Sequence, residues 1–324
     1  MVEDTCRCHQ RLSVNGFAFC AMAHAVVGNL GFPPQSRVAI FHVDDVGMCH
    51  GANVAFEELS RFGAVNCASV MVPCPWFREV AEMAAADPEL DLGVHLTLTS
   101  EWATYRWAPI STTLRSSGLI DPQGYFWRRI PMLASQVVPE AAEAEMRAQI
   151  ERALGAGIDV THLDAHMGAA LLPALIDIYL RLGREYRLPV LFPRNFREFT
   201  SVLDFGDVAL EGYEERLADL ERDGWPLIDS FRMSPWVPSS ESDRAYRDLV
   251  SGLPSGLTLI AIHANKSGDI ETMSPAKAHC RTDEYRIFGS KEFRGFIAGL
   301  GIRTLGFRPL RKLLRRNAES KSSA

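Results

Sequence analysis

Several features that would assign the chain to a specialised class are missing from its sequence. No stretch reaches the ~20 uninterrupted apolar residues of a membrane-spanning helix, so no stable membrane span is expected. Basic residues do not outnumber acidic ones: 34 Lys and Arg face 40 Asp and Glu, a net charge of −6. That balance argues against a nucleic-acid partner. Internal repeats and low-complexity segments are also missing, and we expect an ordinary globular chain.

Cysteine is scarce, with seven residues in 324. An odd number of cysteines scattered along a chain of this length does not form a disulfide framework. Cys6, Cys8 and His9 resemble half of a metal knuckle, but no second pair follows them, and a structural zinc site needs four spaced ligands. We therefore predict a reducing, cytoplasmic location.

The chain divides into three regions. Residues 1–36 form an N-terminal extension, either an extra helix or a poorly ordered segment, because polar residues interrupt its apolar part too often for a secretory signal. Residues 37–308 contain alternating strand and helix patterns. Residues 309–324 form a basic tail, for which a solvated helix end is the favoured interpretation. The hydrophobic content of 47% supports a large core.

Two adjacent acids end the first apolar strand. Residues 38–43 read VAIFHV and run directly into Asp44 and Asp45. An unpaired carboxylate is costly to bury, so this pair needs an explanation. Either one aspartate caps the following helix while the other is solvated, or the two serve a metal ion and a reaction beside it.

Histidines follow the same pattern on three later predicted strands. These are segment 91–98 with His95, segment 158–166 with His162 and His166, and segment 257–263 with His263. In a parallel α/β fold the carboxyl ends of the strands meet at one end, where the active site lies. Imidazole and carboxylate together are ligands for a divalent metal. The sequence therefore predicts a metal site at the strand ends.

These motifs resemble three signatures of the YdjC/ChbG/HpnK carbohydrate deacetylases. They are HVDDVG at 42–47, LGVHLT at 92–97 and THLDAH at 161–166, in the family's order. Asn53 also fits the first signature, and AIH at 261–263 with Arg281 and Glu284 resembles the family's C-terminal block. The resemblance covers about residues 37–308. It implies a TIM-like (β/α) barrel, a divalent metal, and removal of acetyl groups from N-acetylated sugars.

The chain departs from the family pattern at two places. His42 and Val43 stand where the family usually has Asn-Ala before the two aspartates. After His166 the family usually continues with further histidines, whereas residues 167–170 here read MGAA. The metal ligand is retained, but the wall that faces the sugar is different, so the resemblance bears more on the chemistry than on the substrate.

Taken with the resemblance, the motifs assign roles to individual residues. Metal ligands are Asp45, His95 and His166, which leave positions open for water and the acetyl oxygen. Asp44 is the base that accepts the water proton, and His263 is the acid that protonates the leaving amine. Behind the ligands, Asp164 orients His166 or His263, and His162 is either a second supporting residue or an alternative ligand. Two imidazoles favour zinc, whereas the family favours magnesium.

An insertion and one arginine complete the predicted site. Residues 99–139 are rich in aromatics and follow the His95 strand, so they form either a lid with a sugar-binding face or a satellite core. Trp102 and Trp127 are the candidate sugar contacts. Arg194, at the end of a strand predicted over 188–194, binds a substrate hydroxyl or carboxylate, or forms a surface ion pair.

Three functions are compatible with this pattern. The leading one is a metal-dependent deacetylase of an N-acetylated sugar, glycan or glycolipid. The others are a metal hydrolase of another amide or ester, and an inactive barrel that binds sugar. The combination of Asp44, Asp45, His95, His166 and His263 favours an enzyme. A homodimer is a further expectation.

Overall fold

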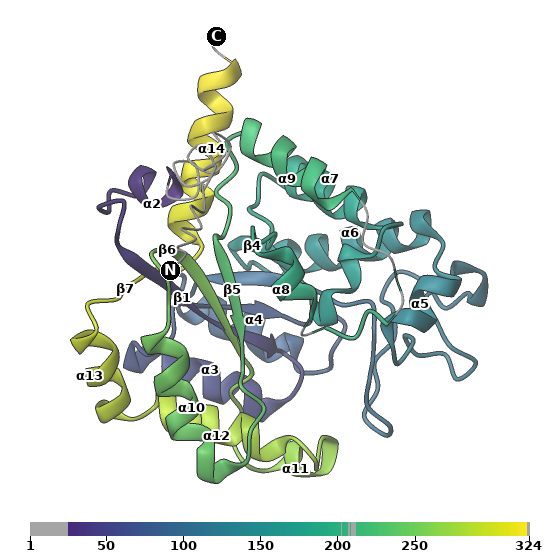
Figure 1. Ribbon diagram of the computed structural model, residues 1–324. Coiled ribbons are helices and arrows are strands. Elements are labelled where there is room, and N and C mark those ends of the chain that lie inside the picture. The colour runs from purple at the N-terminus through teal and green to yellow at the C-terminus, as the bar shows by residue number, and fades with distance from the viewer. Residues whose placement is uncertain (1–24, 202, 207, 209–211, 323–324) are drawn as a thin grey trace, which may run out of the picture.

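A single parallel sheet forms the centre of the molecule (Figure 1). The computed structural model describes residues 25–322 except 202, 207 and 209–211. The strands are β1 (Arg37–Val46), β2 (Cys67–Val70), β3 (Leu92–Leu96), β4 (Val160–Ala165), β5 (Ser230–Met233), β6 (Gly256–Ile262) and β7 (Arg303–Thr304). Their order is β4-β3-β2-β1-β6-β5, with β7 beside the start of β1, and these pairings are parallel. The carboxyl ends of the strands therefore meet at one end of the fold.

Helices surround the strands (Figure 1). They are α2 (Ala25–Asn29), α3 (His50–Phe62), α4 (Phe77–Ala86), α5 (Ile130–Gln136), α6 (Pro139–Gly155), α7 (Ile176–Tyr186), α8 (Phe196–Ser201), α9 (Tyr213–Arg222), α10 (Ser239–Ser251), α11 (Asp269–Met273), α12 (Ala278–Phe288), α13 (Lys291–Gly299), α14 (Arg308–Ser322) and the short 3₁₀ turns η1 (Arg115–Ser117) and η2 (His166–Leu171). Local sequence sets the boundaries of several. Helix α6 begins at Pro139, where a missing N–H costs nothing, and α3 ends at Gly63, whose φ of 72° suits a left-handed cap.

The predicted (β/α) barrel is confirmed in a distorted form, because the barrel does not close through regular strands. The predicted strand 188–194 is reduced to one isolated bridge, Val190 with Leu163 of β4. At the end of this segment, the N–H of Arg194 donates to the carbonyl of Ile228, a residue that precedes β5, at 2.9 Å. The sequence LPVLFPR explains the difference, because two prolines remove the N–H groups that a regular ladder needs.

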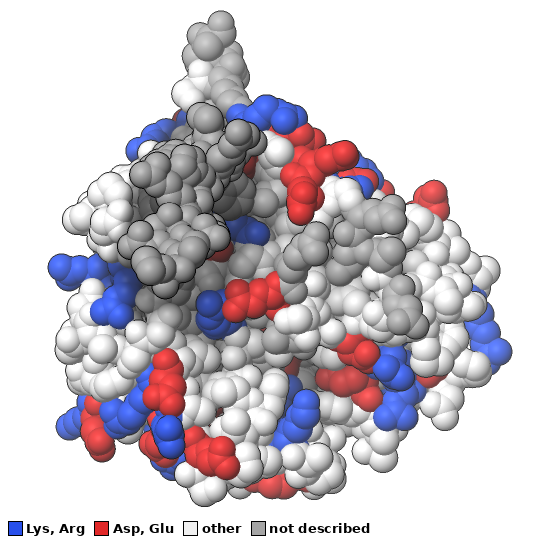
Figure 2. All heavy atoms as spheres, viewed as in Figure 1, with Lys and Arg blue, Asp and Glu red and all other residues white. Residues whose placement is uncertain are grey.

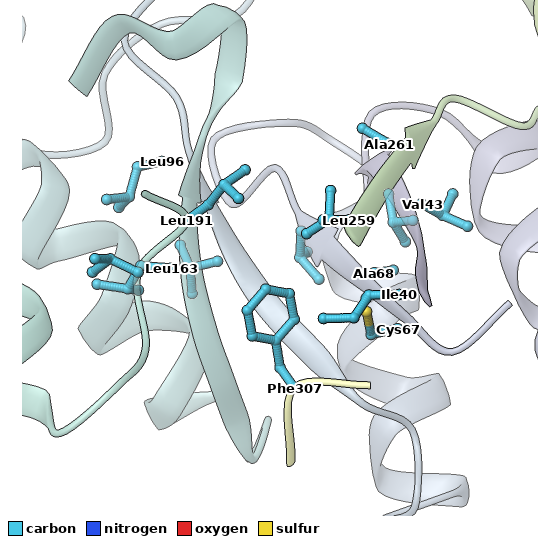
Figure 3. Packing of buried hydrophobic residues seen from close by; sticks show 14 of the residues in the cluster. Ile40, Val43, Cys67, Ala68, Leu96, Leu163, Leu191, Leu259, Ala261 and Phe307 are labelled. Carbon is cyan, nitrogen blue, oxygen red and sulfur yellow. The ribbon is translucent and has the colours of Figure 1, made fainter. Parts of the chain in front are cut away.

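Apolar side chains from the strands fill the interior (Figure 3). Ile40 of β1, Leu163 of β4 and Leu259 of β6 all point into this core, and the ring of Phe307 lies among them. Strand β6 is buried along its whole length, as expected for a strand covered on both faces. The core therefore holds the carboxyl ends of the strands in fixed positions.

Helices also form in three segments outside the regular alternation of strands and helices. Residues 264–287, after the His263 strand, contain α11 and most of α12, whose buried residues include Arg281 and Glu284. The basic tail forms α14, whose Leu310, Leu313 and Leu314 are buried, so it packs on the barrel. Part of the N-terminal extension is the short helix α2, and the rest lies outside the described residues.

Acidic and basic side chains are interspersed on the face shown in Figure 2. Charged side chains form ion pairs across neighbouring elements; two examples in the molecule are Arg216 with Asp177 and Arg286 with Asp243. Cys49, Cys67, Cys74 and Cys280 are free thiols and buried. Within the described residues, every helix is too short or too polar to cross a membrane.

Candidate active site

A cavity of about 200 Å³ opens at the carboxyl ends of the strands. Ionisable side chains line part of it: Asp44, Asp45, His95, Glu101, Asp164, His166, His263, Lys277 and Arg281. Apolar side chains line the rest, including Trp102, Met167, Leu191, Phe199, Leu203, Phe231, Met233 and Trp236. The structure thus brings the predicted catalytic and metal-binding residues to one cavity.

The backbone at the end of β1 allows both aspartates to line this cavity. Side chains alternate along a strand, so Asp44 and Asp45 would otherwise point to opposite faces. Asp45 adopts a left-handed conformation with φ 64°, and the pairing of β1 with β2 shifts register between Val43 and Val46. Aspartate tolerates this conformation better than most residues. The irregularity re-aims Asp45, which is the usual effect of a bulge near an active site.

Asn53 holds the turn that follows. It is fully buried in α3, and its Oδ1 accepts a hydrogen bond from the N–H of Gly47 at 2.6 Å. Its Nδ2 donates to the carbonyl of Trp76 at 3.1 Å and to Glu79 at 2.6 Å. Asn53 is therefore a structural clamp behind the two aspartates.

Asp45, His95 and His166 converge on one point. Oδ1 of Asp45 lies 3.5 Å from Nε2 of His95 and 3.2 Å from Nδ1 of His166, and the two nitrogens are 3.3 Å apart. All three residues are at most 3% exposed. The carboxylate oxygen is buried and accepts no hydrogen bond among the described residues.

This triangle has the dimensions of a metal site. Three ligand atoms about 2.0–2.2 Å from one ion lie about 2.8–3.6 Å apart at tetrahedral or octahedral angles. The three observed separations fall in that interval. Asp45, His95 and His166 therefore fit a divalent cation, with the orphaned oxygen of Asp45 as one donor.

Carboxylates behind both histidines fix the orientation of their rings. Nδ1 of His95 lies 3.0 Å from Oγ of Ser69 and 2.9 Å from Oδ1 of Asp164, and Ser69 donates to Asp164 at 2.8 Å. Nε2 of His166 lies 2.9 Å from Glu101. In metal sites such a carboxylate fixes the tautomer and raises the basicity of the ligand. Asp164 thus contacts His95, and not His166 or His263 as the sequence predicted.

The same carboxylates change the pKa values of the two rings. Burial alone would lower them, but Asp164 and Asp45 outweigh it and hold the pKa of His95 well above its usual value. Against the same effect of burial, Glu101 and Asp45 raise the pKa of His166 to about 9. Without a cation the two rings hold protons, so binding a metal must release them.

Arg281 neutralises the other oxygen of Asp45. Its Nη1 donates to Oδ2 of Asp45 at 2.8 Å, and its guanidinium lies 5.7 Å from the ring centre of Trp102 and 6.0 Å from that of Trp236. Burial of Asp45 opposes ionisation, but Arg281 outweighs it and holds the pKa of this carboxyl well below its usual range. Asp45 is therefore a permanent carboxylate.

His263 lies close to Asp44 and is held from behind. Its Nε2 is 3.9 Å from Oδ2 of Asp44, and its Nδ1 is 3.0 Å from Oγ of Ser234. Ser234 in turn donates to Glu284, so Nδ1–H of His263 donates to Ser234 and Nε2 faces the cavity without a proton. Burial and Arg281 lower the pKa of His263 to about 4. The ring is neutral at pH 7.

Three of the predicted residues lie outside both the Asp45 triangle and the lining of the cavity. His162 contacts His42, with their Nε2 atoms 2.8 Å apart, and it is outside the Asp45 triangle. Arg194 pairs with Glu221 and, at 3.1 Å, with Asp229, and it is not among the residues that line the cavity. Trp127 donates from Nε1 to the carbonyl of Gly118 at 2.8 Å, inside the insertion. Trp102 does line the cavity.

Two supporting residues were difficult to predict from the sequence. Glu101 is one of two acids in an insertion without periodicity, and Ser69 is a single hydroxyl in an apolar strand. Only the fold brings Glu101 to His166, and Ser69 to His95 and Asp164. A polar residue inside an apolar strand was the one available signal for Ser69, because buried polar groups need partners.

The chain is similar to several known proteins. Residues 38–299 match the family model described as YdjC-like protein. A carbohydrate deacetylase of Thermus thermophilus is 40% identical over 159 residues, 49% of this chain and 54% of that protein. A carbohydrate deacetylase of Brevibacillus brevis is 38% identical over 154 residues, 48% of this chain and 58% of that protein. The matches thus span little more than half the length of these relatives.

A solved structure shares the fold. It is a protein of Enterococcus faecalis V583, named as a cellobiose-phosphate cleavage protein, with a TM-score of 0.68 and 23% identity. The match covers 85% of this chain and 99% of that one. The family model extends over most of the barrel and includes all three sequence signatures. The chain therefore belongs to the YdjC-like family.

Proposed function

We propose that the protein is a metal-dependent hydrolase that removes the acetyl group from an N-acetylated sugar, glycan or glycolipid. One observation carries this proposal: a metal-sized triangle of Asp45, His95 and His166 lies beside a second carboxylate, Asp44, in the same cavity. Both relatives described above are named carbohydrate deacetylases, which supports the sugar substrate.

Asp45, His95 and His166 would hold the cation. When bound, it would polarise the acetyl carbonyl and lower the pKa of a water molecule. Two imidazoles and one carboxylate favour zinc or another transition ion, whereas membership of the family favours magnesium. Metal analysis of the purified protein, followed by reconstitution with each ion, distinguishes the two.

Asp44 and His263 would move the protons of the reaction. Asp44 accepts a proton from the attacking water, and its Oδ2 is 3.9 Å from Nε2 of His263. Because His263 starts neutral, it must first receive a proton before it donates one to the leaving nitrogen. Transfer from Asp44 to His263 to the amine satisfies this requirement, and the proton taken from water leaves on the product.

The cavity wall indicates which sugars fit. Met167, Leu191, Phe199, Leu203 and Phe231 form an apolar side, and Trp102 offers an aromatic face near the ligands. Met167 stands where the family has further histidines. These side chains favour a sugar that carries an apolar substituent, as in a glycolipid. They also fit the second candidate, an amide or ester hydrolase with an apolar substrate.

An acetate-release screen tests the proposal. Purified protein is incubated with N-acetylated sugars, with and without an apolar aglycone, and with O-acetyl and simple amide controls. We expect acetate release that a chelator abolishes and added metal restores, with higher kcat/KM for the substituted sugars. Release from simple amides or esters alone would identify the alternative hydrolase. No release from any substrate, in protein that binds both metal and sugar, would favour the inactive barrel.

Replacing His263 by alanine separates proton donation from metal binding. We expect metal content to stay unchanged and turnover of amide substrates to fall by about 10²–10⁴-fold, the usual scale for general acid–base catalysis. Acetyl esters with a good leaving group should lose much less, because their leaving oxygen needs no proton. Steady-state kinetics on both substrates measure the difference, and an equal loss on both would contradict the assignment.

Replacing Glu101 by glutamine tests the support behind His166. Glutamine keeps the length of the side chain but removes the charge that raises the basicity of the ring. We expect metal affinity to fall by about 10–100-fold, as for other residues that hold a ligand in place. Competition with a chelating dye measures it. The control is Glu89→Gln in the exposed turn before β3, which should leave affinity unchanged.

A further inference from the structure

A continuous chain of hydrogen bonds runs from Asp44 into the interior of the barrel. Oδ1 of Asp44 is 2.6 Å from Nδ1 of His42, and Nε2 of His42 is 2.8 Å from Nε2 of His162. Nδ1 of His162 is 2.9 Å from Oγ1 of Thr161, which is 2.5 Å from Oδ1 of Asp91. Asp91 precedes β3, so the chain joins the cavity to the opposite end of the strands.

Two glycines and an aromatic ring pack closely against this chain of hydrogen bonds. A Cβ atom on Gly93 would lie 2.5 Å from the ring of His162, and one on Gly306 would lie 2.3 Å from Oδ2 of Asp91. The ring of Phe307 stacks on His162, with ring centres 3.7 Å apart and planes inclined by 14°. Two glycines and a stacked ring thus fix the imidazole of His162 and the carboxyl of Asp91.

The number of protons in the chain follows from its geometry. Four contacts join the five groups, and each contact needs one proton between its two heavy atoms. Neutral His42, neutral His162 and Thr161 supply one proton each, three in all. If Asp44 and Asp91 were both ionised, one contact would join two acceptors. The chain must therefore hold one more proton.

Two neighbours do not change this conclusion. The hydroxyl of Thr161 also lies 3.1 Å from the carbonyl of Leu92. If it donated there, the four contacts of the chain would lack a further proton. Oδ2 of Asp164 faces Nε2 of His42 at 3.9 Å, which is too long for a hydrogen bond. One additional proton is thus the minimum.

Burial indicates where this proton rests. Asp91 is buried, whereas Asp44 is only partly buried and borders the cavity. An ionised carboxylate costs more free energy in the more deeply buried position. In agreement, burial raises the pKa of Asp91, although Thr161 and the N–H of Arg308 oppose it. Burial holds the pKa of His162 well below its usual value, so this ring is neutral. His42 is as deeply buried, and a second proton on its ring would add a charge there.

We propose that Asp91 holds the additional proton, and that Thr161, His162 and His42 act as positioning residues which thereby keep Asp44 an oriented carboxylate. In this arrangement each group of the chain donates its hydrogen bond to the neighbour that lies nearer the cavity. The Asp91 hydroxyl donates to Thr161, Thr161 to Nδ1 of His162, Nε2–H of His162 to His42, and Nδ1–H of His42 to Asp44. Oδ2 of Asp44 remains free for substrate water. Only the catalytic purpose of this arrangement rests on the proposed function.

The tautomers of the two histidines test the proposal without an activity assay. We label histidine with nitrogen-15 in the full-length protein and assign His42 and His162 from the spectra of His42→Asn and His162→Asn. The proposal requires a proton on Nδ1 of His42 and on Nε2 of His162. The opposite tautomers would place the proton on Asp44, and a doubly protonated His42 would place it on the ring. Either result overturns the proposal.

Two variants extend the test. Asp91→Asn presents an NH₂ group to Thr161 in place of the proposed hydroxyl, and its carbonyl can accept from the N–H of Arg308, as Oδ2 does now at 2.8 Å. We expect both tautomers to persist. Changed tautomers in folded Asp91→Asn would show that Asp91 is ionised and overturn the proposal. In Thr161→Val, His162 loses the donor to Nδ1, and its tautomer should change.

Kinetics provide the second readout. Thr161→Val should lower kcat by about 10-fold or more with KM unchanged, because the base is misplaced and the sugar contacts remain. The matched control is Thr258→Val, a buried threonine on β6 whose hydroxyl makes no hydrogen bond among the described residues. His42→Asn should retain more kcat than His42→Ala, because an amide can still donate to Asp44. Equal losses would contradict a positioning role.

The two proposals fail in different ways. If the wild-type protein deacetylates no substrate, the proposed function is wrong, but the tautomers still decide whether Asp91 holds the proton. If turnover is found and the tautomers are reversed, the deacetylase stands and the role of the buried chain is wrong. A Thr161→Val protein that fails to fold leaves the wild-type and Asp91→Asn spectra to decide.

Discussion

Turnover of the Asp44→Asn protein is expected to be lower than that of the wild type by about 10²–10⁴-fold, with bound metal almost unchanged. Asparagine keeps the size of the side chain but has no basic oxygen to accept the proton of water. In the proposed site the metal is held by Asp45, His95 and His166, and the substitution leaves these three side chains in place. Steady-state kinetics and metal analysis of the same preparation measure both quantities.

Asp248→Asn is the control for Asp44→Asn. Asp248 is an exposed aspartate of α10, and its loss should affect neither turnover nor metal content. If Asp44→Asn instead loses its metal, the roles assigned to the two adjacent aspartates must be exchanged. Unchanged turnover would exclude Asp44 as the base.

Asp45→Asn is expected to lose both the metal and much of the stability of the protein. The substitution removes a ligand charge and also leaves Arg281 as a buried cation without its partner, since Oδ2 of Asp45 accepts from Arg281 at 2.8 Å. Breaking a buried pair on one side costs about 3–5 kcal/mol. Urea unfolding of chelator-treated protein measures this loss separately from that of the metal.

The effect should depend on pH in a defined direction. Because Arg281 overcomes burial and holds the pKa of Asp45 below its unfolded value, the ionised carboxylate stabilises the protein at neutral pH. This contribution is complete above the unfolded pKa of about 3.9 and is lost as the pH falls through the lower folded value. The stability difference between wild type and Asp45→Asn should therefore shrink in acid.

A second substitution checks the cause. Adding Arg281→Met to Asp45→Asn removes the unpaired cation, so part of the lost stability should return while the metal does not. Failure to recover any stability would show that the loss comes from packing and not from the unpaired charge of Arg281.

Much of this site could be predicted because the strand pattern carries it. Apolar segments that end in Asp or His mark the carboxyl ends of parallel strands, and the fold places Asp44, Asp45, His95 and His166 together, as that pattern requires. The histidine that Asp164 contacts was not predictable. Whether Asp164 faces His95 or His166 depends on the register of β3 with β4, which pairs His95 directly with Asp164.

Errors occurred where tertiary contacts override local pattern. Arg194 follows an apolar run, but Glu221 and Asp229 from later segments bind it away from the cavity, and neither has a recognisable motif. Residues 264–287 have weak helical periodicity, and α12 forms because buried Arg281 and Glu284 find partners in the core. His42 seemed an ordinary strand residue, since its contact with His162 joins positions 120 residues apart.

The irregular segment 188–194 gives the two sides of the cavity unequal freedom to evolve. The metal side stands on β1, β3 and β4, where one displaced strand would disturb several ligands at once. The apolar side draws on Leu191 of this segment and on Phe199 and Leu203, which follow it in the chain. An isolated bridge joins the segment to β4, and the hydrogen bond from Arg194 to Ile228 joins it to the residues before β5. Substitutions there can reshape the apolar wall while the Asp45, His95 and His166 triangle stays intact. Selection can therefore diversify what the cavity admits without rebuilding the proposed metal site.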